Sequence, residues 1–228
     1  MTGELIRFEG KEYRVVRLLG KGKAAWSWLL ENQQDRIVLK QMHDEPCSYY
    51  RFTDKYASEI AAYQKLKAMN IPVPELIGTD EEKRFLFKEY IHGPTAAEFI
   101  AEGRMNEKML GQLMRMGEMA LASGFNLDYF PANFVWSCHQ LYYVDYELNL
   151  YDAQWNLKNW GLYYWVNARG MKAFLQTGDA GHINRNAEKG IPVRKGFEET
   201  VKRICEGDFL EFTKNELRQQ LNKNTGNA

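Results

Sequence analysis

The hydrophobic pattern changes period along this chain, and the change limits the folds that the chain can adopt. Up to about Ile91, short runs of β-branched and aromatic residues alternate with turn residues such as Glu9-Gly10-Lys11, as is typical of antiparallel strands. One helical pattern interrupts these runs from about Tyr49 to Met69, with Glu59 close to its apolar face. After about Thr95 helical spacing predominates. We therefore expect a strand-rich part followed by a helical part.

Turn residues and prolines set the boundaries of the expected elements. Strands are predicted at Phe8–Leu19 (in two pieces), Ala25–Leu30, Arg36–Lys40, Glu75–Gly78 and Arg84–Ile91. Helices are predicted at Thr95–Glu102, Glu107–Ser123, Asp152–Leu175 and Phe197–Leu221, and a hairpin is predicted to join Phe134–Trp136 to Leu141–Tyr146. This order predicts an α+β fold with two lobes, a small strand-rich N-lobe (1–91) and a mainly helical C-lobe (92–228).

Charge and composition narrow the classes of partner. The 228 residues carry 30 basic and 30 acidic side chains, so we expect neither nucleic acid nor an anionic membrane as a partner. No apolar run reaches the roughly 20 residues that span a bilayer, and the N-terminal segment is too charged for a signal peptide. Three widely spaced cysteines, Cys47, Cys138 and Cys205, do not suggest a disulfide framework. We expect a cytoplasmic protein, and its oligomeric state stays open.

Residues 124–136, GFNLDYFPANFVW, place polar groups where neither a helix nor a strand explains them. Asp128 and Asn133 flank Pro131, just ahead of the apolar run Phe134–Trp136. Two interpretations compete, an ordinary turn and a catalytic loop. In a catalytic loop Asp128 would accept a proton from an attacking hydroxyl group, and Asn133 would offer an oxygen to a metal ion.

Further polar or flexible residues stand at the ends of predicted strands. Asp145 follows an apolar strand, where a carboxylate suits a hard divalent cation. Lys40 ends another strand, and a buried lysine and a buried carboxylate such as Glu59 each need a partner. Gly20 and Gly22 stand between two strands, where the backbone N–H groups of a flexible turn can approach phosphates. Taken singly, each residue also has an ordinary structural explanation, a solvated strand end or a hairpin turn.

In their order and approximate spacing these residues resemble the protein-kinase-like superfamily, over about residues 13 to 165. The segment Asp128–Asn133 is similar to its D-x-x-x-x-N catalytic loop, and Val144–Glu147 stands where its metal-binding aspartate motif belongs. The other similar segments are the glycine-rich loop at Leu18–Gly22, the phosphate-binding lysine at Val38–Lys40, the helix around Glu59, and the hinge at Phe87–Thr95.

The resemblance implies an ATP-dependent phosphotransferase that uses Mg²⁺. Its nucleotide would be held by Gly20, Gly22, Lys40 and the backbone of the hinge residues Glu89 and Ile91. Glu59 would steady Lys40, Asp128 would orient the hydroxyl group of the acceptor, and the metal ligands would be Asn133 and Asp145.

The chain departs from the superfamily pattern at several positions. Asn126 replaces the usual histidine, Ala25 stands where a third glycine would fall, Glu147 replaces the glycine of D-F-G, and Lys88 precedes the hinge. Lys88 leaves the preference between ATP and GTP open. No long activation segment follows Glu147. Three alternatives therefore remain: a small-molecule kinase similar to aminoglycoside and choline kinases, a compact protein kinase of the RIO type, and a pseudokinase that binds nucleotide without transfer.

The acceptor is not identified by the sequence. The aromatic residues between Trp155 and Trp165 are expected to pack the second lobe, and in a second interpretation some of them form an acceptor-binding wall. The polar segment Gly178–Gly190 would then border the same site. An acidic pocket beside Asp128 would indicate a cationic small molecule, and a flat surface would indicate a protein.

Overall fold

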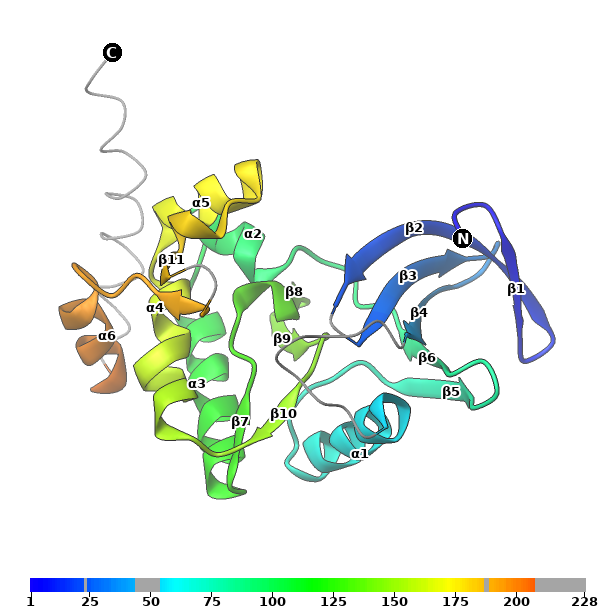
Figure 1. Ribbon diagram of the computed structural model, residues 1–228, viewed down its shortest axis with the longest axis horizontal. Coiled ribbons are helices and arrows are strands. Elements are labelled where there is room, and N and C mark those ends of the chain that lie inside the picture. The colour runs from blue at the N-terminus through cyan, green and yellow to red at the C-terminus, as the bar shows by residue number, and fades with distance from the viewer. Residues whose placement is uncertain (23, 44–53, 187–188, 208–228) are drawn as a thin grey trace, which may run out of the picture. The chain divides into compact units, whose positions relative to one another are not determined.

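The computed structural model describes residues 1–22, 24–43, 54–186 and 189–207, and the protein is of the α+β class, as expected (Figure 1). Its chain forms two compact units. The N-terminal unit comprises Met1–Lys67 and Val73–Ile91, and the C-terminal unit comprises Ala68–Pro72 and His92–Ala228.

The N-terminal unit is built on one curled antiparallel sheet with the strand order β1-β2-β3-β4-β6-β5 (Figure 1). Its strands are β1 (Leu5–Phe8), β2 (Lys11–Lys21), β3 (Ala25–Glu31), β4 (Arg36–Met42), β5 (Leu76–Asp80) and β6 (Phe85–Glu89). The predicted strands of this part all occur, with their ends displaced by a few residues. Glu9 and Gly10 adopt left-handed φ angles of 48° and 75°, which allows the tight turn between β1 and β2.

The two faces of this sheet carry separate apolar clusters. Leu39 and Phe87 belong to a cluster on one face, and Met42 and Leu86 pack on the other face against Tyr56 of α1 (Lys55–Ala68). Successive side chains of a strand point to opposite faces. Lys40 follows Leu39 in β4, so its side chain points to the opposite face, the face on which Met42 and Leu86 pack against α1.

The described residues of the C-terminal unit are mainly helical, and they include four α-helices longer than one turn: α2 (Ala96–Ala101), α3 (Glu107–Ala122), α5 (Ala168–Thr177) and α6 (Glu198–Cys205). Thr95 and Glu98 form a capping box at the start of α2, and Asn106 caps α3. The buried face of α3, which includes Met109, Leu113 and Met116, supplies much of the core.

Short paired strands carry the loops of this unit. They are β7 (Phe125–Leu127) with β10 (Leu148–Leu150), β8 (Phe134–Ser137) with β9 (Gln140–Tyr143), and β11 (Asn184–Asn186) with β12 (Ile191–Pro192). The predicted hairpin is β8–β9, and its two-residue turn places Cys138 and His139 at φ angles of 48° and 65°. Its second strand ends at Tyr143, so the expectation that it reaches Tyr146 was wrong.

The helix predicted at Asp152–Leu175 is divided into several pieces. They are a 3₁₀ turn (Ala153–Trp155), a π-helical turn (Leu157–Gly161), α4 (Leu162–Trp165) and α5. Three side chains accept hydrogen bonds from the backbone at the starts of pieces: Asp152 from Gln154, Asn156 from Asn159, and Asn167 from Gly170. Each of these bonds begins a new turn, because a capping residue has non-helical backbone angles.

Two helices are shorter than predicted. The first begins at Lys55 and not near Tyr49, because Asp54 Oδ1 accepts hydrogen bonds from the N–H groups of Tyr56 and Ala57 and so caps its start. The last helix ends at Cys205, with Glu206 as its C-cap and Gly207 at a left-handed φ of 88°, so the expectation of one helix continuing to Leu221 was wrong; residues 208–221 lie outside the described part. In the part of the chain that the structure describes, no helix is both long and apolar enough to cross a bilayer.

Candidate functional site

Lys40 and Glu59 form an ion pair in the N-terminal unit, and Lys88 joins it. Lys40 Nζ lies 2.8 Å from Glu59 Oε1, and Lys88 Nζ lies 2.6 Å from the same oxygen. The side chains are 9%, 10% and 3% exposed for Lys40, Glu59 and Lys88. One buried carboxylate oxygen therefore accepts hydrogen bonds from two buried ammonium groups.

Strand register explains why the two lysines meet. In the antiparallel pair of β4 and β6, Lys40 stands opposite Leu86 and Val38 stands opposite Lys88. The two lysines are thus diagonal neighbours on one face, the face that α1 covers. Glu59 reaches them from the second turn of α1. Without Glu59, the positive charges of Lys40 and Lys88 would lie close together in a buried environment.

The electrostatics of Glu59 combine opposing effects. Burial alone raises its pKa, because a charge is costly away from water. The positive charges of Lys40 and Lys88 and their two hydrogen bonds lower the pKa more strongly, so that it lies below its usual value. Glu59 is therefore a carboxylate at neutral pH, as an ion pair that positions Lys40 requires.

The predicted glycine loop is shorter than expected. Gly20 belongs to β2, opposite Ser27, and the turn itself is closed by a 2.9 Å hydrogen bond from the Gly22 N–H to the Ala25 carbonyl. A Cβ atom on Gly20 would meet no atom within 4 Å, and one on Gly22 would meet only the Ala25 oxygen at 3.6 Å. Packing within the protein therefore does not require glycine at either position.

The predicted hinge follows β6. Glu89 is the last residue of β6, and its backbone N–H donates to the Glu75 carbonyl at 2.9 Å. The Glu89 carboxylate accepts a 3.2 Å hydrogen bond from the Glu75 N–H. Ile91 is buried two residues later. Of the two predicted hinge residues, Glu89 therefore already has its backbone N–H bonded to the Glu75 carbonyl.

Asp128 lies in the C-terminal unit, in the loop between β7 and a 3₁₀ turn (Pro131–Asn133). Its half-buried side chain accepts a 3.1 Å hydrogen bond from the Phe130 N–H through Oδ1. The neighbouring Tyr129 carbonyl accepts a 2.8 Å hydrogen bond from the indole of the fully buried Trp165. The hydrogen bonds from the Phe130 N–H and from the Trp165 indole therefore hold the loop in one conformation.

Asn133 and Asp145 are brought together by the backbone. The Asn133 carbonyl accepts hydrogen bonds from the N–H groups of Val144, at 2.9 Å, and Asp145, at 3.4 Å. Asn133 Nδ2 lies 3.4 Å from the Asp128 carbonyl oxygen, which leaves Oδ1, the atom that a hard cation prefers, outside this contact. Asp145 itself is exposed, just past the end of β9.

A buried tyrosine ties these two loops to each other. The Tyr143 hydroxyl accepts hydrogen bonds from the N–H groups of Asp128, at 2.8 Å, and Glu147, at 2.9 Å, and donates to the Glu147 carbonyl at 2.9 Å. Burial, together with the negative charge of Asp128, raises its pKa far above the usual value. The hydroxyl therefore stays protonated and fixes the Asp128 loop to the segment that carries Asp145.

No protein-family model and no curated protein matches this sequence. The interpretation of the site therefore depends on the geometry of its residues.

Asn126, which departs from the superfamily pattern, has a structural role. It is buried on β7, opposite Asn149 of β10, and its Nδ2 donates to the Asp152 carbonyl at 2.7 Å. The bond connects the strand before Asp128 to the start of the divided helix. Asn126 thus supports the loop that carries Asp128.

The sequence marked Lys88 only as a departure before the hinge and did not predict its ion pair with Glu59, and it predicted no role for Tyr143. The signal for Lys88 was the alternation of β6, in which Phe85 and Phe87 face one cluster and Leu86 and Lys88 the other face. Nothing in the sequence around Tyr143 distinguishes it from its neighbour Tyr142. Its role follows only from the turn that returns the chain past its hydroxyl.

The metal ligands predicted from the sequence are Asn133 and Asp145. Groups of His, Cys, Asp and Glu side chains are another common way to hold a metal ion. Among the described residues, no three or more such side chains are grouped closely enough to hold a metal ion. The pair Asn133 and Asp145 would supply two oxygen ligands, which fits Mg²⁺, since Mg²⁺ keeps several waters and is commonly bound through one or two carboxylates and the phosphates of a substrate.

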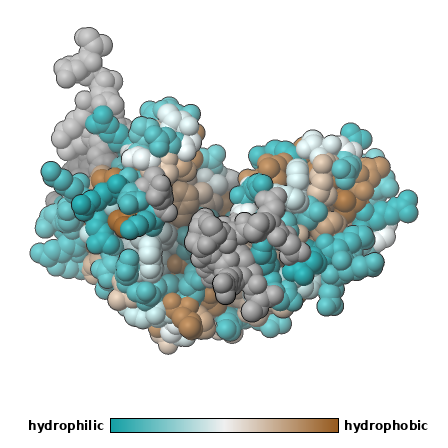
Figure 2. Space-filling model, viewed as in Figure 1, coloured by the Kyte–Doolittle hydropathy of each residue, from teal (hydrophilic) through white to brown (hydrophobic). Residues whose placement is uncertain are grey.

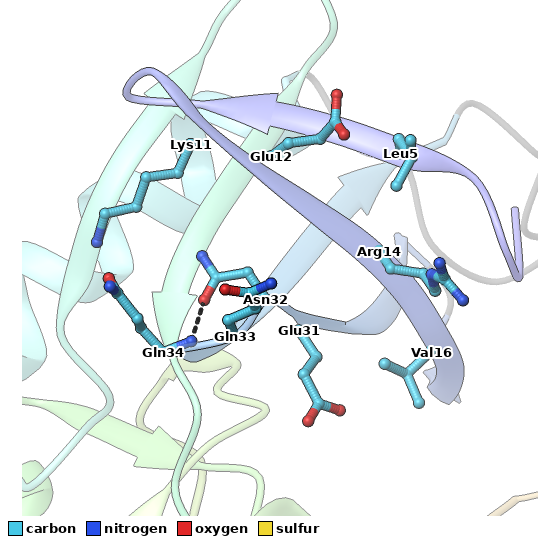
Figure 3. A pocket seen from close by; sticks show the side chains of 9 residues that line it. All are labelled: Leu5, Lys11, Glu12, Arg14, Val16, Glu31, Asn32, Gln33 and Gln34. Carbon is cyan, nitrogen blue, oxygen red and sulfur yellow. Dashed lines mark hydrogen bonds between the residues drawn. The ribbon is translucent and has the colours of Figure 1, made fainter.

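A pocket of about 680 Å³ lies elsewhere in the N-terminal unit (Figure 3). Its side chains come from β1, β2, the end of β3 and the turn that follows β3, and they include Lys11, Arg14, Glu12 and Glu31. Both signs of charge are present in equal number among these four. It contains none of the candidate residues, and we assign it no role.

Proposed function

We propose that this protein is an ATP-dependent phosphotransferase of the kinase-like type, which moves the γ-phosphoryl group to a hydroxyl group of a small molecule. The observation that carries the proposal is the buried Lys40–Glu59 ion pair. Burying an ion pair costs desolvation energy that an apolar pair would not, so such a pair is a poor way to gain stability alone. An ammonium group held rigid on strand β4 by an ion pair is well suited to bind nucleotide phosphates.

The glycines of the β2–β3 turn agree with this proposal. Packing does not require glycine at positions 20 and 22. We therefore infer that these positions lack side chains because a ligand approaches the backbone there. Backbone N–H groups without neighbouring Cβ atoms allow close approach of phosphate oxygens. We assign Gly20 and Gly22 to the phosphates and the backbone near Glu89 and Ile91 to the base.

The residues of the C-terminal unit take the chemical roles. Asp128 orients the acceptor hydroxyl and takes its proton while the hydroxyl oxygen bonds to the γ-phosphorus and the bond from that phosphorus to ADP breaks. Asn133 and Asp145 would hold Mg²⁺, whose positive charge would offset the negative charge of the phosphates. Their shared backbone hydrogen bonds keep the two ligands at a fixed spacing.

Positioning and electrostatic stabilisation would supply most of the rate acceleration, with Lys40 steadied by Glu59 and Asp128 steadied by the Phe130 N–H. No covalent intermediate with the protein is needed.

The experiment that tests this function is transfer of labelled phosphate from ATP to a panel of small alcohols and to mixed proteins. Asp128→Asn is expected to bind Mg–ATP like the parent and to lose transfer by about 10²- to 10⁴-fold, the usual contribution of a general base. Asp152→Asn is the matched control, because asparagine caps a helical turn as well as aspartate does.

Each outcome of that experiment has a distinct meaning. Transfer to small alcohols that depends on Asp128 supports the proposal. Transfer to proteins alone would indicate a compact protein kinase of the RIO type. Binding of Mg–ATP without transfer to any acceptor would indicate a nucleotide-binding pseudokinase, and equal transfer by Asp128→Asn and the parent would refute the assignment of Asp128.

A further inference from the structure

A pocket of about 960 Å³ lies within the C-terminal unit, beside the divided helix and the β11–β12 pair. Its wall includes the indole rings of Trp155 and Trp160 and the side chains of Arg185, Arg194, Lys195 and Glu198. The volume falls in the range typical of small-molecule sites. None of the residues assigned above to the nucleotide, to Mg²⁺ or to proton transfer lines it.

The charged side chains of this pocket are unequal in sign. Three basic residues and one acidic residue line the pocket, so the lining carries a net charge of +2. The chain as a whole is balanced, with 30 basic and 30 acidic residues, so this excess is local. Among the described residues, neither Arg185 nor Lys195 forms an ion pair. The surface over β11 and α6 is mostly hydrophilic (Figure 2).

Arg194 is held in place before any ligand arrives. Its Nη2 donates to the Asn159 carbonyl at 2.6 Å, and its guanidinium group lies 5.3 Å from the centre of the Tyr163 ring. These contacts reduce the conformational freedom that Arg194 would lose on binding. A preorganised arginine favours recognition of a carboxylate or phosphate.

The aromatic wall is also fixed. Trp155 and Trp160 meet edge to face, with ring centres 5.9 Å apart. The Trp160 indole N–H donates to the Gly190 carbonyl at 2.9 Å, so the polar edge of this ring is satisfied. The ring faces are apolar, and such faces bind flat, unsaturated ligands by stacking.

Ring contacts connect this wall to the loop of Asp128. Trp160 meets Tyr164 with ring centres 5.1 Å apart, and Tyr164 meets Phe130, two residues past Asp128, at 5.4 Å. Burial raises the pKa of Tyr164, and the negative charge of Asp128 raises it further. The pocket and the Asp128 loop thus share one packed group of side chains.

We propose that this pocket binds a small anionic ligand that contains a flat ring, and that this ligand is the hydroxyl-bearing acceptor. The second clause rests on the proposed phosphotransferase function, and the first does not. The alternatives expected from the sequence were an acidic pocket for a cationic acceptor and a flat surface for a protein. The pocket is neither, because its wall is concave and basic.

Binding is tested with phenyl phosphate as the probe, followed through the indole N–H signal of Trp160 in ¹H–¹⁵N NMR spectra. Benzyltrimethylammonium has the ring with the opposite charge, and inorganic phosphate has the charge without the ring. We expect phenyl phosphate to shift the Trp160 signal with saturation and to bind at least about tenfold more tightly than either comparison probe. Its affinity should fall as salt is added.

Charge reversal separates the pocket from the rest of the surface. Arg185→Glu with Lys195→Glu should weaken phenyl phosphate by about tenfold or more, since attraction is replaced by repulsion. Lys108→Glu is the matched control on α3, an exposed lysine outside the pocket, and should leave the affinity unchanged. The milder pair Arg185→Gln with Lys195→Gln serves if the reversal disturbs folding. Equal binding of the cationic and anionic probes, or an equal loss in Lys108→Glu, would overturn the proposal.

The acceptor role is tested separately by transfer of labelled phosphate to 4-(hydroxymethyl)benzoate and to the neutral benzyl alcohol. Preference for the anionic alcohol, lost in the charge-reversed variant, supports the role. Binding of phenyl phosphate with no such preference would remove the acceptor role while leaving the pocket. Absence of transfer to every alcohol, with phenyl phosphate still bound, would remove the proposed function alone.

Discussion

Lys88 shares one carboxylate oxygen with Lys40, and this sharing makes the Glu59 site sensitive to pH in one direction. The pKa of Glu59 is lowered in the folded protein, so its ion pairs contribute stability above its unfolded pKa of about 4.3, and this contribution is lost as the pH falls through the lower folded value. Lysine at position 88 therefore protects the N-terminal unit against acid. It does so through Glu59, without needing to contact a nucleotide.

Replacement of Lys88 tests this role. In Lys88→Met, Glu59 keeps Lys40 but loses one of the two charges that lower its pKa, so acid unfolding should begin at a higher pH. Circular dichroism followed from neutral pH to about pH 2, below the reference pKa of a carboxyl group, measures the midpoint.

A matched control is Lys11→Met, which removes the exposed ion pair with Asp35, whose side chains are 52% and 43% exposed. Exposed pairs contribute little, so its midpoint should stay with the parent. An equal shift in both variants, or none in Lys88→Met, would contradict a special role for the buried lysine.

The Tyr143 hydroxyl is the second residue with an identifiable positioning role. Tyr143→Phe removes one group that makes three hydrogen bonds and leaves the N–H groups of Asp128 and Glu147 without this partner, at a cost of about 1–3 kcal/mol of unfolding free energy for a buried unsatisfied group. Amide hydrogen exchange should accelerate at Asp128 and Glu147. In the transfer assay kcat should fall while the KM for ATP changes little.

Tyr142→Phe is the matched control, because Tyr142 is the neighbour on the same strand with a half-buried side chain. Its exchange rates and kcat should match those of the parent. If Tyr143→Phe lowered stability without accelerating exchange at the two amides, the hydroxyl would be a packing element and not the tie between the two loops.

At the scale of elements, the sequence predicted the sheet well and the divided helix poorly. Strand alternation and turn residues such as Glu9-Gly10 act locally, so the strands could be placed from the sequence. The aromatic residues from Trp155 to Trp165 occur at helical spacing and suggested one continuous helix. The capping side chains of Asn156 and Asn167 overrode that spacing, because each bonds to a backbone N–H and starts a new turn.

The π-helical turn has a packing reason at Gly161. A Cβ atom there would lie 2.5 Å from the Tyr129 Cβ, closer than side chains tolerate, and Tyr129 adjoins Asp128. Gly161→Ala should therefore lower the unfolding free energy by about 1–3 kcal/mol, as overpacking of a core does. Urea denaturation measures the change.

Gly111→Ala provides the comparison, as a helical glycine on α3 whose added Cβ would lie no closer than 3.7 Å to another atom. It should stabilise the protein by about 0.5–1 kcal/mol, because alanine is the better helix former. Destabilisation of the two variants by equal amounts would show that contact with Tyr129 is not what requires glycine at 161.

At the scale of the whole molecule, two pairs of candidate site residues could be predicted from the sequence. Lys40 and Glu59 could be paired in advance because each needs a buried partner. Asn133 and Asp145 stood near each other along a predicted hairpin. The participation of Lys88 and Tyr143, and the basic pocket lined by Trp155 and Trp160, depend on contacts between residues distant in sequence. Those contacts arise only when strands pair and the helices pack.

The central proposal is that the binding of Mg–ATP depends both on Lys40 and on Asp145. Its most direct test is calorimetric titration of Mg–ATP into the parent, Lys40→Met, Asp145→Asn and the exposed control Asp179→Asn. We predict that the first two variants each weaken binding by at least about tenfold, the effect of losing one charge-assisted contact, and that the control binds like the parent. Binding of Mg–ATP by Lys40→Met or by Asp145→Asn with the affinity of the parent would contradict the claim.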